Sequence, residues 1–173
     1  MQSRSLVPVV ALAFVAVLAS CDNDITSINE GLDDTATWVA DLNAANERQS
    51  TPVNSPATGR AWFTDNGNTL TFYIEYRDLV APLTLAHIHR GTADISGPVM
   101  VDLRLTTGQR SGVWAGTVDM TVADVSSEAG VQSPADLRAL LNSGGTYVNI
   151  HTSGTTTPPG YPAGEIRGQL NPR

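Results

Sequence analysis

Apolar and polar residues alternate along much of this chain, and the alternation predicts β-strands. In TWVADLNA, Trp38, Ala40 and Leu42 alternate with other residues, and PVMVDLRL and GVWAGTVDM show a similar period of two. Such a period places the apolar side chains on one face of a sheet. APLTLAHIHRG, TYVNIHT and GEIRGQL are also short strand-forming segments bounded by turn residues. We therefore expect a strand in each of these segments.

Turn-forming residues separate the predicted strands. ERQSTPVNSPATG is rich in Pro, Ser and Thr and is expected to form a loop, and TADISG is expected to form a turn. RAWFTDNGNTLTFYIEYRDL contains two strand-forming runs on either side of DNGN. The Asn66-Gly67 pair in that segment is expected to supply the positive φ angles of a tight hairpin turn.

One segment has the pattern of a helix. SPADLRALLNSGG combines an N-capping residue, a proline in the first turn, an apolar face and a terminating glycine pair. These features lie at Ser133, Pro134, Leu137, Leu140, Leu141, Gly144 and Gly145. The sequence contains no long amphipathic helix that could cover a parallel sheet. It therefore predicts an all-β fold, an antiparallel Greek-key-like β-sandwich or flattened barrel with one short helix.

The beginning of the chain has the pattern of a secretory signal. Arg4 precedes an apolar run that is too short for a comfortable membrane span. The run ends in LASC, which resembles the bacterial lipobox, where the signal is cut before a cysteine that then receives lipid. An ordinary signal followed by a chance cysteine is the alternative. We expect a lipoprotein signal at residues 1–20, lipidation at Cys21, a flexible acidic tether at residues 21–35 and one domain at residues 36–173.

The single cysteine and the net charge limit where the chain is expected to lie in the cell and which partners it is expected to bind. A lipidated Cys21 would anchor the exported chain to the lipid bilayer of the bacterial cell envelope, at a periplasmic or outer surface. The formal net charge of −7 argues against nucleic acid as a partner, because nucleic acid binding needs clustered positive charge. Cys21 is the only cysteine, so an internal disulfide and a cysteine-based zinc site are both excluded.

Two long segments carry a resemblance to a known family. HIHRGTADISGPVMVDL, followed by YVNIHTSGTTTPPGYPAGEIRGQL, resembles the chordin-type repeat domain, or CHRD domain. The similarity covers residues 36–171 and includes Asn46-Glu47, Pro52 and the Leu-rich helix. The chain departs from the family in the turn after His89 and in the long proline-rich loop before GEIRG. Chordin binds extracellular growth factors, but a bacterial lipoprotein has no such ligands, so the resemblance implies only a non-enzymatic binding or structural module.

The three histidines of the chain are candidate metal ligands. His87 and His89 share one face of a strand, with Cα atoms roughly 6.5–7 Å apart, and His151 lies in a later strand. An HxH pair with a distant histidine resembles the copper half of the Cu,Zn superoxide dismutase sandwich, which implies copper first and zinc second. The bridging histidine, the zinc-site aspartate and the disulfide of that enzyme are missing here.

A structural role for the histidines is the other interpretation. Glu165 and Arg167 stand at i and i+2, so a continuous strand would place both on one face beside the imidazoles. A carboxylate, a guanidinium and imidazoles can form a satisfied polar network that sets strand register. Alternatively, Glu165 could orient a ligating histidine from behind. The sequence leaves both interpretations open.

Catalysis and partner binding have weaker signals. The chain has no Gly-x-Ser-x-Gly elbow, no phosphate-binding glycine loop and no HExxH motif, and Asp94, Asp102 and Asp119 are candidate hydrolytic acids by residue type only. We therefore expect no catalytic residue, with copper-dependent redox activity as the alternative. Trp38, Trp62 and Trp114 fall in alternating strands and are expected in the core. The exposed loop around Tyr161 is better placed to meet a protein or glycan partner.

Overall fold

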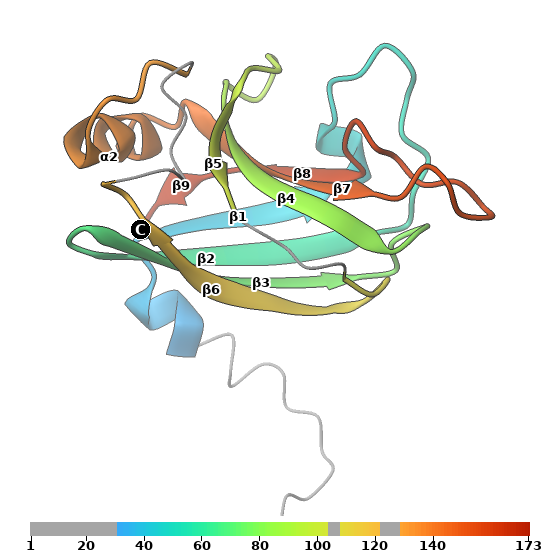
Figure 1. The fold of residues 1–173 in the computed structure, drawn as a ribbon, viewed down its shortest axis with the longest axis horizontal. Coiled ribbons are helices and arrows are strands. Elements are labelled where there is room, and N and C mark those ends of the chain that lie inside the picture. Colours follow the sequence, from blue (N-terminus) through green and yellow to red (C-terminus); the bar gives the residue numbers. More distant parts are fainter. Residues whose placement is uncertain (1–30, 104–107, 122–128) are drawn as a thin grey trace, which may run out of the picture.

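The fold is one curled antiparallel sheet. The computed structural model describes residues 31–103, 108–121 and 129–173. The sheet has the strand order β5-β4-β7-β8-β1-β2-β3-β6, with a short β9 added beside β1 (Figure 1). The strands are β1 Trp38–Asn43, β2 Thr58–Asn66, β3 Thr69–Arg77, β4 Leu83–Arg90, β5 Val99–Asp102, β6 Gly112–Asp119, β7 Thr146–Thr152, β8 Ile166–Gln169 and β9 Asn171–Pro172. The predicted all-β antiparallel class is confirmed.

The hairpin between β2 and β3 forms where the sequence predicts it, with one change in the turn. Asn66 pairs with Thr69 and still belongs to β2, so Gly67 and Asn68 connect the strands. Only Gly67 among these residues has a positive φ, of 77°. A two-residue turn with glycine first needs a positive φ at that position alone. The turn is therefore displaced by one residue from the predicted Asn66-Gly67 pair.

The predicted helix is confirmed as α2, Pro134–Asn142. Ser133 has extended backbone, and its side chain accepts a hydrogen bond from the amide of Asp136, which is the geometry of an N-cap. Leu137 and Leu141 are buried. The Trp38 indole donates a 2.9 Å hydrogen bond to the side-chain oxygen of Asn142, so the end of α2 is tied to β1.

The inward face of the sheet encloses the core. Its alternating strand positions are apolar and almost fully buried, among them Leu42, Phe63, Ile74, Ile88 and Ile150. The two outermost strands of the sheet, β5 and β6, do not pair with each other in the strand order. The indole of Trp114 on β6 nevertheless donates a 3.2 Å hydrogen bond to the carbonyl of Leu103, just after β5. A side chain thus links the two sides of the curled sheet.

A helical turn lies just before the predicted domain boundary at residue 36. Residues 31–35 form a helical turn, and the Asp33 carboxylate accepts hydrogen bonds from the Trp62 indole at 2.6 Å and from Arg60 at 2.9 Å. Asp33 also pairs with Arg173 at 2.9 Å. The end of the predicted flexible tether is therefore attached to the domain, because one carboxylate there satisfies an indole and two guanidinium groups.

The same contact corrects the interpretation of the tryptophans. Trp38 belongs to the core and Trp114 packs against it, as expected. Trp62 is buried, but on the outer face, where it contacts Asp33 and stacks edge-on with Tyr73. Its contacts there are with the helical turn and with β3, and it does not belong to the core cluster. The predicted signal and Cys21 lie outside the described residues, and within those residues no helix is long and apolar enough to cross a membrane.

Candidate metal site

The three histidines meet on the outer face of β4 and β7. Opposite residues of an antiparallel pair share a face, and His87 pairs with Asn149 while His89 pairs with Tyr147. His151 is two residues beyond Asn149 and so lies on the same face. The intervening Ile88 and Ile150 point into the core and are fully buried. The alternation that buries these isoleucines thus places the imidazoles together on the other side of the sheet.

The imidazole nitrogens are close enough to share one ion. The Nδ1 atom of His87 lies 3.2 Å from the Nε2 atom of His151. One ring nitrogen from each of His87, His89 and His151 can be chosen so that all three lie within 4.8 Å of one another. The structure therefore brings together all three histidines that the sequence marks as candidate ligands.

Backbone carbonyls orient two of the rings. The Nδ1 atom of His89 lies 3.0 Å from the carbonyl oxygen of Gly97, and Nδ1 of His151 lies 2.9 Å from that of Pro162. A carbonyl oxygen only accepts, so both Nδ1 atoms carry the proton and both neutral rings present a bare Nε2. The Nε2 atom of His89 is buried and has no hydrogen-bond partner among the described residues. Metal-binding histidines are commonly held in this way by a hydrogen bond on the second nitrogen.

Gly97 is needed for this arrangement. A Cβ atom at Gly97 would collide with the carbonyl oxygen of Arg90, so the loop approaches the end of β4 closely only because the residue is glycine. The amide of Gly97 donates to the hydroxyl of Tyr147, and its carbonyl accepts from His89. The loop thereby links the imidazole to the neighbouring tyrosine.

Burial keeps the three imidazoles neutral. It lowers the pKa of His87 to about 4, with smaller effects in the same direction from His151 and His89. Burial also lowers the pKa of His89 and that of His151, against the opposing effect of their carbonyl partners. Neutral imidazole is the form that binds metals, so the site needs no deprotonation at neutral pH.

Arg167 is connected to the histidine cluster through Tyr147. Its guanidinium carbon lies 3.4 Å from the ring centroid of Tyr147, and the Tyr147 ring stacks on His89 with centroids 4.9 Å apart. The guanidinium also donates to the carbonyl oxygens of Thr92 at 2.6 Å and Ile95 at 3.0 Å. Arg167 is fully buried, so it holds the loop before Gly97 against the sheet.

Glu165 lies elsewhere, contrary to the expectation that it shares a face with Arg167. Its carboxylate accepts hydrogen bonds from the hydroxyls of Ser55 and Thr152 and from the amide of Val80, at 2.5–2.7 Å. None of these partners is a histidine. The strand β8 begins only at Ile166, so the alternation that relates i and i+2 in a strand does not extend to Glu165.

Two further polar residues on this face were not anticipated from the sequence. Asn149 lies between His87 and Arg167 in the sheet, and Glu47 follows the short helix η1, Ala44–Asn46. The side-chain oxygens Oδ1 of Asn149 and Oε1 of Glu47 are buried without a hydrogen-bond partner in the described part of the chain. Burial raises the pKa of Glu47. Alternation in TYVNIHT could have identified Asn149, whereas Glu47 was marked only by the Asn46-Glu47 pair of the CHRD resemblance and by no sign of its position in the fold.

The candidate acids do not converge. Asp94 is exposed in a loop, Asp119 ends β6 and accepts from Thr121, and Asp102 lies opposite His87.

The loop around Tyr161 folds back onto the domain, with the tyrosine hydroxyl donating to the carbonyl of Asn54 at 2.9 Å.

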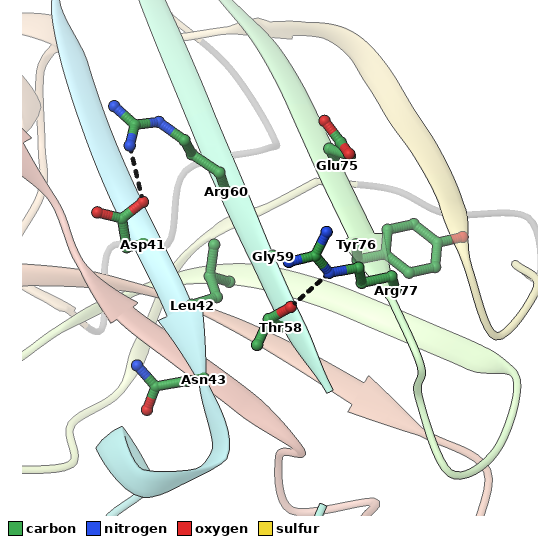
Figure 2. A pocket seen from close by; sticks show the side chains of 9 residues that line it. All are labelled: Asp41, Leu42, Asn43, Thr58, Gly59, Arg60, Glu75, Tyr76 and Arg77. Carbon is green, nitrogen blue, oxygen red and sulfur yellow. Dashed lines mark hydrogen bonds and ion pairs between the residues drawn. The ribbon is translucent and has the colours of Figure 1, made fainter. Parts of the chain in front are cut away.

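A groove also lies on the outer face of β1, β2 and β3 (Figure 2). Arg60 crosses from β2 to Asp41 on β1 at 3.0 Å, and Arg77 donates to the Thr58 hydroxyl at 2.9 Å. Both guanidinium groups thus have partners on neighbouring strands, and the residues lining the groove include no histidine. The groove offers no comparable donor set.

Comparison with known proteins agrees with the sequence motifs. The CHRD domain model matches residues 38–170, and the match contains β1 through β8 and all three histidines. No curated protein and no solved structure matches the chain. The matched domain indicates a binding or structural module. The match spans most of the sequence, and the chain therefore belongs to the CHRD domain family.

Proposed function

We propose that this chain is an exported cell-envelope lipoprotein whose CHRD domain binds one transition-metal ion, copper or zinc, through His87, His89 and His151. The convergence of three neutral imidazoles within 4.8 Å carries the proposal. The domain acts as a binding module and not as an enzyme, and the lipid on Cys21 attaches it to the membrane.

The spacing of two of the nitrogens suits a tetrahedral ion. Nitrogen ligands lie about 2.0–2.1 Å from zinc, so two of them in tetrahedral geometry are about 3.3 Å apart. The Nδ1 atom of His87 and the Nε2 atom of His151 are separated by 3.2 Å. In the protein without metal, His87 donates to His151 at this position. An ion would be held here by the His87 tautomer that carries its proton on its own Nε2 and leaves Nδ1 free to bind.

The Nε2 atom of His89 is the third nitrogen that could bind the same ion. Nε2 of His89 is buried without a partner among the described residues, and an unsatisfied polar atom of this kind costs free energy. A metal ion would satisfy it. Imidazole nitrogens suit both zinc and copper, and copper(II) binds such donors more tightly in the usual order of affinities.

Titration of copper and zinc into the purified full chain tests the proposal. A Cys21→Ser background removes the only thiol, which would otherwise compete for metal. We expect one ion per chain by calorimetry, with a Cu(II) spectrum typical of nitrogen ligands. His87→Ala and His151→Ala should each weaken binding strongly. Binding no tighter than that of the triple histidine-to-alanine variant would show that the histidines are structural.

The membrane anchor needs a separate test. The support for it is the apolar run that ends in LASC with the only cysteine of the chain. Expression in a bacterial host with a labelled fatty acid should label the wild-type chain and leave Cys21→Ser unlabelled. Equal labelling of both chains, or none, would contradict the lipoprotein assignment.

A further inference from the structure

Asp102 lies beside the histidine cluster on the adjacent strand. It pairs directly with His87, and β5 is an outermost strand of the sheet. Residues that are directly opposite in an antiparallel pair have Cβ atoms about 4.5–5.5 Å apart and lie on the same face. Asp102 is exposed, whereas Val101 next to it is fully buried. Its side chain therefore extends from the face that carries the imidazoles.

A β-bulge keeps Asp102 on that face. Ile88 pairs with Val101 but His89 pairs with Val99, so Met100 is an extra residue in β5. Met100 and Val101 are both fully buried. The bulge therefore leaves Val99 and Asp102, three residues apart, outside the core. Bulges often redirect side chains beside functional sites.

The charge of the site favours a carboxylate at this position. Three imidazoles are neutral ligands, so a bound divalent ion would keep its full charge in a site that also has Arg167 nearby. Asp102 lies directly opposite His87 on the adjacent strand, so an acidic side chain stands on the same face as the ring that would bind the ion.

We propose that Asp102 supplies the fourth ligand of the site and makes it selective for divalent ions, Zn(II) or Cu(II), over Cu(I). This inference rests on the proposed metal-binding function. The Asp102 carboxylate is not part of the three-histidine cluster within 4.8 Å, and rotation of this exposed side chain is the motion that would bring it to the ion. Carboxylate oxygen is a hard donor that zinc accepts, whereas Cu(I) prefers soft ligands.

Metal titrations of Asp102→Asn test the assignment. All variants are full chains in the Cys21→Ser background, and Asp119→Asn is the matched control because Asp119 is an exposed strand-end aspartate on β6. We expect Asp102→Asn to bind Zn(II) about 10- to 100-fold more weakly, as when a supporting carboxylate of a metal site is lost. Cu(I) affinity, measured against a colorimetric chelator, should be unchanged. The Co(II) spectrum should shift in Asp102→Asn and not in Asp119→Asn.

The outcomes separate the two proposals. If the parent chain binds no metal, the function proposed above fails and the role of Asp102 fails with it. If the parent chain binds Zn(II) and Asp102→Asn binds it equally well with the same Co(II) spectrum, the fourth-ligand role is overturned while the three-histidine site stands. Thermal unfolding of each metal-free variant shows whether it is folded, and a loss of zinc affinity in a folded variant supports the inference.

Discussion

The guanidinium of Arg167 lies 3.4 Å from the ring centroid of Tyr147, and both side chains are buried. Tyr147 is on β7, between the strand of His89 and the strand of Arg167. A cation stacked on an aromatic ring in a desolvated site stabilises the fold by about 2 kcal/mol or more. This contact fixes the side chains on the outer face of the sheet that lie next to the imidazoles.

Replacement of Arg167 by lysine should destabilise the domain by about 2–3 kcal/mol. Lysine lacks the planar group that stacks on Tyr147 while donating to the carbonyls of Thr92 and Ile95. Urea unfolding measures the change. Arg77→Lys is the control, because Arg77 is exposed and, within the described part of the chain, donates to the Thr58 hydroxyl, and it should change stability by less than about 0.5 kcal/mol. Equal effects of the two substitutions would contradict a structural role for the buried contact.

Metal should stabilise the folded chain. An ion that binds only the native state adds about 2.7 kcal/mol at a free concentration one hundred times the dissociation constant. Thermal unfolding with and without Zn(II) should therefore show a higher midpoint in the loaded chain. The triple variant of His87, His89 and His151 should show no zinc-dependent change. A similar rise in that variant would mean that the ion binds elsewhere.

The metal-free chain should lose stability as the pH falls from about 6.5 toward 4. Burial, then His151 and His89, lower the pKa of His87 to about 4, while Asp102 opposes the shift. Between these values the unfolded chain binds a proton that the folded chain does not, so stability falls as the pH decreases, by up to about 1.4 kcal/mol per pH unit for each such group.

Comparison with His87→Gln isolates this contribution. Denaturant unfolding at several pH values between 4 and 7 should give a shallower loss in the variant. The raised pKa of Glu47 acts in the opposite direction, but both proteins contain Glu47, so its effect cancels in the difference. Parallel curves for the two proteins would show that protonation of His87 does not oppose folding.

Loss of the Glu165 carboxylate should affect stability and not metal binding. Its three hydrogen bonds join Ser55, Val80 and Thr152, and Glu165 is fully buried. Glu165→Ala should destabilise the domain by about 3 kcal/mol or more, because it leaves buried donors without an acceptor. Zinc affinity of the folded fraction should match that of the parent chain. A large loss of affinity at unchanged stability would instead place Glu165 in the metal site.

Removal of the Asp33 carboxylate should release the helical turn at residues 31–35. Asp33→Ala loses the hydrogen bonds from Trp62 and Arg60 and the pair with Arg173. We expect a loss of about 1–2 kcal/mol and a red-shifted tryptophan emission as Trp62 becomes exposed. Asp34→Ala, next to it in the turn, is the control. Emission and stability equal to those of the control would show that the turn does not protect Trp62.

Local pattern was sufficient for most of the fold. The alternation around Trp38, the turn at Gly67 and the cap at Ser133 predicted β1, the β2–β3 hairpin and α2. These signals depend on residues close in sequence, so they can be read without the fold. The displaced hairpin turn and the attachment of residues 31–35 to the domain were missed, because each depends on a contact or a register that the local sequence does not specify.

The candidate site was predicted only in part. An alternating strand guarantees that His87 and His89 share a face, but Glu165 was placed wrongly because the strand begins one residue after it. The carbonyl of Gly97 and the carboxylate of Asp102 were not recognised as neighbours of the imidazoles. Both come from the segment that follows β4, and their positions depend on the loop and on the bulge in β5.

The sequence by itself determined the strand pattern, the one short helix, the membership of the CHRD family and the identity of the three histidines. These properties follow from side-chain periodicity and from motifs that are contiguous in the chain. Only the tertiary structure decided that β4 lies between β5 and β7, and that order places His151 and Asp102 on either side of His87. Strand order and register arise from the packing of the whole core, so no local segment contains them.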